Sequence, residues 1–319
     1  MSRKMIASLM VAVFGISLLS GCAPSAKIAL TFAPQQTARY ESTSKIIKDV
    51  EFDQPSLKKN KKEQVNTTIM VKFDQTIADV QPDGTAMADI VIRAVQFKQI
   101  NKNETRLDFD STAEKSKNEP LSKIIGQSYR IAMDPNGTVK VIDAAKARAA
   151  VSGSDEQKKI AQKILSDESI VERHQLPLPK AGQNMISAGK SWTRVVPSPP
   201  GLLAPKIFEK VYTVSAVDKD KAVVTMSARE NLTQKVEGPK NAGNLGFLAK
   251  LFDNQDEYTG KIVLNMAGGT LEEYEETLVS SYTAQDKPTD KPKDTAQQDV
   301  APDTLIMRLT YGISIKKVN

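Results

Sequence analysis

Histidine and cysteine, the side chains most often used for acid–base, nucleophilic and metal chemistry, are nearly missing from this 319-residue chain. His174 is the only histidine and Cys22 is the only cysteine. A metal site of imidazoles or thiolates needs several such ligands, and a catalytic triad would have to be built on His174 alone. We therefore predict no catalytic residue, no metal site and no cofactor, and we expect His174 to be a solvated residue beside Arg173.

Carboxylates are the remaining candidates, because paired acids need no histidine. They occur in two clusters, one of Asp253, Asp256 and Glu257, and one of Glu272, Glu273, Glu275 and Glu276. Neither cluster has the spacing of a calcium loop. We expect Glu272 and Glu276 on a solvated strand face with Tyr274 on the other face. An enzyme built on Asp253, Asp256 or His174 ranks third among the functions considered.

The surroundings of Cys22 indicate export and lipid attachment. Arg3 and Lys4 precede an apolar stretch, Met5–Leu19, that is too short to cross roughly 30 Å of hydrocarbon and is typical of a secretion signal. Leu19-Ser20-Gly21-Cys22 then resembles the lipobox of bacterial lipoprotein precursors. That resemblance implies a signal peptide over residues 1–21 and a diacylglyceryl group on the sulfur of Cys22, which becomes the first residue of the mature chain.

The predicted anchor makes a membrane the first expected partner. Because an exported protein with disulfides would need a second cysteine, a lone Cys22 favours lipidation over the alternative of an ordinary small residue. Two or three acyl chains would hold the chain essentially permanently. Ala23 stands where inner-membrane lipoproteins carry Asp, so the resemblance implies the cell envelope and, in a Gram-negative bacterium, the periplasmic side of the outer membrane.

The charge of the chain argues against nucleic acid as a partner. The formal net charge is +6, and loss of the signal peptide removes two of these charges. Both signs are interspersed, and no arginine-rich block with interleaved aromatic residues occurs. We expect no binding of nucleic acid.

Strand signals dominate the chain after an anchor and tether predicted at residues 22–37. Four hairpins are predicted around the turns Pro82-Asp83-Gly84, Pro135-Asn136-Gly137, Asp218-Lys219-Asp220-Lys221 and Ala267-Gly268-Gly269. A change of hydrophobic period between Asp143 and Gln175 predicts a helical insert. Residues 286–303 lack apolar periodicity and predict a disordered charged loop, after which Leu305–Ile315 returns as a strand.

These elements predict a mainly β fold with a helical insert, in the α+β class. The first β half, residues 38–175 with the insert, and the second, residues 176–319, repeat a similar order of long and short hairpins. Curved antiparallel sheets wrapped over one or two helices would form a half-barrel, or a pair of half-barrels, with a concave apolar face. Whether the two similar halves form one domain or two stays open at this level.

The order of turns and strand entries resembles a family of uncharacterised bacterial lipoproteins defined by a domain of unknown function. The features that carry the resemblance are Tyr40, Phe73–Phe97 with Asp83-Gly84, Asp108-Phe109-Asp110-Ser111, Ile124-Ile125-Gly126, Tyr129–Met133, Asn136-Gly137-Thr138-Val139 and Gly189-Lys190-Ser191-Trp192. It covers roughly Tyr40–Tyr282 and implies a fold but no activity.

Two hypotheses for function follow. The first is a non-enzymatic envelope lipoprotein that binds a lipid or another amphiphile on its concave face. Its ligand groove would include an amphipathic set, Leu245, Phe247, Leu248 and Leu251, whose alternative role is to cover the core. The second is a structural or assembly protein that docks another envelope component through its surface, including the charged loop at residues 286–303.

Overall fold

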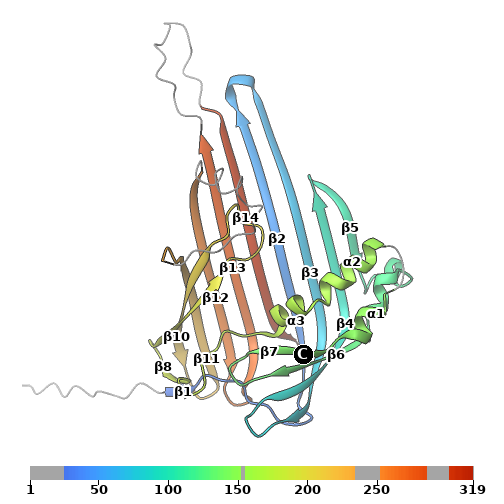
Figure 1. The fold of residues 1–319 in the computed structure, drawn as a ribbon, viewed down its shortest axis with the longest axis vertical. Helices are drawn as coiled ribbons and strands as arrows, with labels where there is room; N and C mark the ends of the chain where they lie inside the picture. The colour runs from blue at the N-terminus through green and yellow to red at the C-terminus, as the bar shows by residue number, and fades with distance from the viewer. Residues whose placement is uncertain (1–24, 152–154, 234–251, 286–301, 319) are drawn as a thin grey trace, which may run out of the picture.

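The computed structural model describes residues 25–151, 155–233, 252–285 and 302–318. Within these residues, twelve strands form one large antiparallel sheet, which is curved but not closed into a barrel (Figure 1). A small helical insert accompanies the sheet. The predicted fold class, mainly β with a helical insert, is confirmed.

Each half of the chain supplies one side of the sheet. The first side contains β2 (Thr37–Gln54), β3 (Lys59–Val80), β4 (Ala86–Asn101), β5 (Glu104–Asp110), β6 (Ser128–Met133) and β7 (Val139–Asp143). The second contains β9 (Ser191–Pro197), β10 (Ile207–Val217), β11 (Lys221–Glu230), β12 (Asp253–Asn265), β13 (Thr270–Gln285) and β14 (Thr304–Val318).

The two sides meet at a central seam. The strand order is β7-β6-β4-β3-β2-β14-β13-β12-β11-β10-β9, with β5 paired to β4. β14 pairs with β2 over fifteen registered positions, from Thr304 opposite Asp53 to Val318 opposite Arg39. The chain therefore moves outward from β2 to one edge, crosses to the opposite edge, and returns strand by strand to the seam.

The predicted hairpins are all present, because their turn residues allow tight reversals. β3 and β4 are joined around Gly84, and β6 and β7 are joined around Gly137. Both glycines have positive φ, 87° and 80°, which side-chain-bearing residues adopt only with strain. Two further pairs, β10 with β11 and β12 with β13, match the hairpins predicted in the second half.

The predicted helical insert is also confirmed. α1 (Ala145–Ala149), α2 (Asp155–Ile164) and α3 (Asp167–His174) follow β7, and Ser166 caps α3 by accepting a hydrogen bond from the backbone N–H of Ser169. The insert and the connector after it lead from β7, at one edge of the sheet, to β9 at the other (Figure 1). Buried apolar residues of the insert, including Ala147, Ala161, Ile164 and Ile170, join the hydrophobic core.

Part of the predicted tether is wrong, because residues 25–37 pack against the body. β1 (Ser25–Lys27) pairs with β8 (Met185–Ser187), and Ile28 and Leu30 are buried. The Leu30 N–H donates to the carbonyl of Pro135 at 2.8 Å, and the Thr31 N–H donates to that of Gly269 at 2.9 Å. The segment thus joins turns from both sides of the sheet at one end of the molecule, which we call the base.

The alternation of Ile28, Leu30 and Phe32 is the signal that the tether prediction missed. These side chains cover apolar groups that the sheet would otherwise expose at its base, and burial of apolar surface favours docking by about 25 cal/mol per Å2. Among the described residues, no helix is both long and apolar enough to cross a membrane.

Candidate functional site

Two adjoining cavities lie on the inner face of the sheet beside α3. One has a volume of about 400 Å3 and the other about 320 Å3. They share three lining residues, Glu168, Glu172 and Tyr311. We call the two cavities together the inner cleft.

A third cavity lies nearer the base, among Leu30, Tyr40, His174 and Ile315, but its volume of about 40 Å3 suits only one or two water molecules.

The walls of the inner cleft combine apolar and polar groups. The larger cavity is lined on its apolar side by Val171, Val196, Tyr212 and Ile313. The smaller one is lined by Ile46, Ile69 and Pro200, together with Lys45 and Lys163. Strands from both sides of the seam and helix α3 therefore contribute to one site.

A buried ion pair lies in the wall of the larger cavity. Lys210 of β10 donates to Glu276 of β13, and both side chains are buried. Glu276 also accepts hydrogen bonds from the hydroxyls of Tyr258 and Tyr274, the latter at 2.6 Å. The Lys210 ammonium lies 4.5 Å from the centre of the Tyr258 ring, which adds a cation–π contact. The carboxylate thus has three donors in place of water.

This arrangement corrects the expectation for Glu276. It is not on a solvated face opposite Tyr274, because residues two positions apart in a strand point to the same side. Tyr274 and Glu276 are both buried on the inner face. Glu273 and Glu275, by contrast, form ion pairs with Lys316, whose side chain is half exposed.

Burial controls the protonation of this cluster. Desolvation lowers the pKa of Lys210, with Glu276 opposing the shift and Arg194 adding to it. Desolvation also raises the pKa of Tyr212 and Tyr258, and the charge of Glu276 adds to both shifts. Both hydroxyls therefore stay protonated at neutral pH, and that of Tyr258 donates its hydrogen bond to Glu276.

Helix α3 forms the opposite wall. Glu168 and Glu172 are one turn apart, are both exposed, and border both cavities. Glu172 accepts a hydrogen bond from the Tyr311 hydroxyl of β14. Across the larger cavity, Arg194 of β9 donates to the carbonyl of Leu178 at 2.5 Å. The cleft therefore presents acidic groups on one wall and a guanidinium on another.

A loop at residues 198–206, which we call the strap, runs from β9 to β10 over the inner face. A Cβ added at Gly201 would lie 3.2 Å from Cε of Lys48 and 3.5 Å from Cδ1 of Leu309, so the strap reaches the seam strands. Pro200 of the strap lines the smaller cavity. The strap therefore covers part of the inner cleft.

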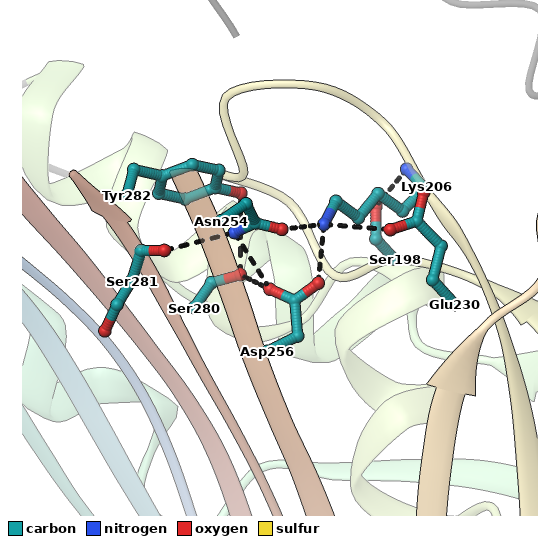
Figure 2. A network of polar contacts seen from close by, with 8 residues as sticks. All are labelled: Ser198, Lys206, Glu230, Asn254, Asp256, Ser280, Ser281 and Tyr282. Carbon is teal, nitrogen blue, oxygen red and sulfur yellow. Dashed lines mark hydrogen bonds and ion pairs between the residues drawn. The ribbon is translucent and has the colours of Figure 1, made fainter. Parts of the chain in front are cut away.

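Lys206 fastens the strap at its end. Figure 2 shows its ammonium among Asn254, Asp256 and Glu230. The ammonium lies 2.5 Å from the Asp256 carboxylate and 3.1 Å from that of Glu230. Asp256 in turn accepts a hydrogen bond from Ser280. Despite burial, these acidic neighbours raise the pKa of Lys206, so it stays charged. The acidic cluster noted in the sequence is thus divided: Asp256 belongs to this network, whereas Asp253 and Glu257 are exposed.

His174 is buried, so the expectation of a solvated histidine is wrong. Its Nε2 lies 2.7 Å from the hydroxyl of Tyr129, and the Phe73 ring contacts its face edge-on with centroids 4.7 Å apart. Burial, with the nearby charge of Arg173, holds the pKa of His174 well below 6.5. Because α3 ends at His174 and packs on the sheet, its last turn faces the core. The described residues contain no group of three or more potential metal ligands.

The sequence did not identify the inner cleft itself. The predicted groove residues Leu245, Phe247, Leu248 and Leu251 lie outside the described residues, as do Cys22 and residues 286–301. The cleft residues alternate with outward-facing residues along β9, β10 and β13, but this period alone does not distinguish a cavity wall from a packed core.

These features define an open antiparallel half-barrel whose inner face carries a cleft between the sheet and a helical insert. The chain belongs to a family of unknown function, DUF6263, whose model matches residues 83–270. The expectation of a domain of unknown function is thereby confirmed.

The comparison with curated proteins found no match. Among solved structures, a chain described under "Lipid-protein interactions in lipovitellin" is similar with a TM-score of 0.44 and 12% identity. The similarity covers 90% of this chain and 25% of that chain, so this protein corresponds to about a quarter of the lipovitellin chain.

Proposed function

We propose that this protein is a non-enzymatic lipoprotein of the bacterial cell envelope that binds an amphiphile in the inner cleft. The observation that carries the proposal is the pair of cavities of about 400 and 320 Å3 that α3 and the strap leave open on the inner face. Small-molecule sites typically have about 300–1,000 Å3 and combine mostly apolar walls with a few placed polar groups.

The chemistry of the walls favours a molecule with both an apolar and a polar part. Val196, Tyr212 and Ile313 offer apolar contact, while Arg194 and Glu172 offer hydrogen bonds and charge at the same cavity. In the larger cavity Lys210 and Glu276 satisfy each other, which leaves Arg194 as a cation that this cavity offers to an anionic head group. A lipid or a lipoprotein tail matches this description.

The envelope assignment is supported by the sequence. The apolar stretch Met5–Leu19 supports export, and Leu19-Ser20-Gly21-Cys22 supports lipidation of Cys22. In a Gram-negative bacterium, Ala23 after the anchor supports the periplasmic face of the outer membrane. The membrane is then a partner through the lipid, and the cleft serves a second, exchangeable molecule.

Native mass spectrometry after periplasmic expression tests ligand binding. The mature chain with Cys22→Ser is expected to carry a co-purified lipid. Val196→Trp, which places an indole in the larger cavity, should remove it. Val195→Trp is the matched control, because Val195 is the neighbouring strand residue and is 46% exposed.

Binding of an amphiphile would be overturned if the Cys22→Ser chain had only the mass of the protein itself and if the competition assay showed no displacement of a fluorescent fatty acid. A stoichiometric envelope protein captured instead, and lost on deletion of residues 286–303, would favour a docking role.

A further inference from the structure

The base of the half-barrel carries an exposed surface close to the predicted anchor. Only two residues, Ala23 and Pro24, separate Cys22 from β1. At no more than about 3.6 Å per residue, the Cys22 Cα lies within roughly 11 Å of Ser25. The lipid, once attached, therefore holds β1 within a short distance of the bilayer.

The exposed surface around β1 has the composition of a membrane contact. Met185, which is 64% exposed, lies opposite Lys27 in the β1–β8 pair. Lys180 and Lys190 flank β8 and are exposed. Among the described residues, no ion pair involves Lys27, Lys180 or Lys190. An exposed apolar side chain opposite Lys27, with exposed Lys180 and Lys190 before and after β8 in the chain, suits the interface of an anionic bilayer.

The base is also suited to hold the folded body in a fixed orientation relative to the bilayer. β1 is paired with β8, and the residues after β1 bridge the turns at Pro135 and Gly269. The anchor is therefore joined to a folded end of the sheet rather than to a long tether. The hairpin between β2 and β3 lies at the opposite end (Figure 1). At about 3.3 Å per residue, the 18 residues of β2 place that hairpin roughly 55 Å from the base.

We propose that the surface formed by Lys27, Lys180, Met185 and Lys190 rests on the bilayer that holds the Cys22 lipid, with the β2–β3 hairpin pointing away from it. The proposal rests on lipidation of Cys22, proposed above. In this orientation the long strands of the half-barrel run away from the bilayer. The inner cleft then opens above the membrane surface and exchanges its ligand with the space beyond it.

Site-specific fluorescence quenching tests the orientation in the full lipidated chain. Because Cys22 is the only cysteine, Met185→Cys supplies the one free thiol when Cys22 is lipidated. The matched control is Leu57→Cys, at the end of the β2–β3 hairpin, where Leu57 is 56% exposed. Each variant is labelled with an environment-sensitive dye and reconstituted into phosphatidylethanolamine–phosphatidylglycerol vesicles containing head-group nitroxide lipid.

The label at position 185 should be quenched several-fold more strongly than the label at position 57. Combining Lys27→Glu, Lys180→Glu and Lys190→Glu with Met185→Cys should reduce that quenching while the chain still floats with the vesicles.

Equal quenching at the two positions in floating vesicles would overturn the orientation and leave the anchor intact. A second labelled thiol and failure to float would instead show that Cys22 is not lipidated. That result would overturn the orientation and the envelope anchor, whereas amphiphile binding is tested separately with the Cys22→Ser chain.

Discussion

Lys210 and Glu276 form an ion pair across two intervening strands, although 66 positions separate them in the chain. The small residues Ala228 and Gly260 lie between them, at the positions registered with Lys210 and Glu276 respectively. The pair thus joins β10 to β13 over the inner face.

Removing one partner of this pair should destabilise the fold strongly. Glu276→Leu leaves the ammonium of Lys210 buried without a counter-ion, and such changes typically lower the free energy of unfolding by about 3–5 kcal/mol. Chemical denaturation measures the loss. The double variant with Lys210→Met should recover much of the stability, whereas a double variant no more stable than Glu276→Leu would contradict the assignment.

The control for that experiment is Lys261→Met. Lys261 pairs with Glu273 at 2.7 Å, but 46% of its side chain is exposed. Exposed pairs contribute about 0–1 kcal/mol, so this change should be nearly neutral.

His174 should make stability depend on pH in the mildly acidic range. Its pKa in the folded protein lies well below the ordinary value of 6.5, because burial disfavours the charged ring. As the pH drops below 6.5, His174 binds a proton in the unfolded chain but not in the folded chain. The free energy of unfolding therefore falls. From pH 7.5 to 5.5 this residue should account for a loss of at most about 1.4 kcal/mol, the limit reached when the folded chain binds no proton at His174 in this range.

The measurement is the change in unfolding free energy between these two pH values, compared with His174→Gln. Glutamine keeps a polar group for the Tyr129 hydroxyl but does not titrate. The variant should lose the contribution of the histidine to the pH dependence of the unfolding free energy and keep the contribution of the carboxylates. Identical pH dependence in the two proteins would show that His174 is not held neutral.

Gly137→Ala should destabilise the protein more than Gly182→Ala. Both glycines have φ of 80°, so the backbone strain of an added side chain is the same. A Cβ at Gly137 would lie 2.6 Å from the Leu176 carbonyl oxygen, whereas a Cβ at Gly182 would meet open space. Overpacking of this kind lowers stability by about 1–3 kcal/mol beyond the strain. Equal losses in thermal or chemical unfolding would contradict the close contact between this turn and Leu176.

Releasing the strap should accelerate ligand exchange. Lys206→Met removes the contacts to Asp256 and Glu230 that hold one end of the strap. Stopped-flow measurement with a fluorescent fatty acid should show faster association and dissociation than in the unchanged chain. Arg229→Met, which removes the exposed pair with Glu209, is the control and should leave both rates unchanged. Unaltered rates in Lys206→Met would show that the strap does not limit access.

The sequence predicted the hairpins and the insert well because their signals are local. Asn136-Gly137 specifies its turn whatever surrounds it, and the period of the insert reflects one face of each helix. The environments of Glu276 and His174 were mispredicted because they depend on distant partners, Lys210 and Tyr129. The inner cleft depends on how α3 and the strap cross the sheet, which no local pattern encodes.

The seam between β2 and β14 determines when this protein can finish folding. β2 lies near the beginning of the chain and its partner β14 near the end, and the segment at Leu30 and Thr31 needs turns at Pro135 and Gly269. During synthesis, these early residues stay without their partners until nearly the whole chain has been made. Long loops of this kind slow folding and leave strand edges exposed. A nascent chain of this protein therefore keeps the seam edge of β2 unpaired until β14 has been made.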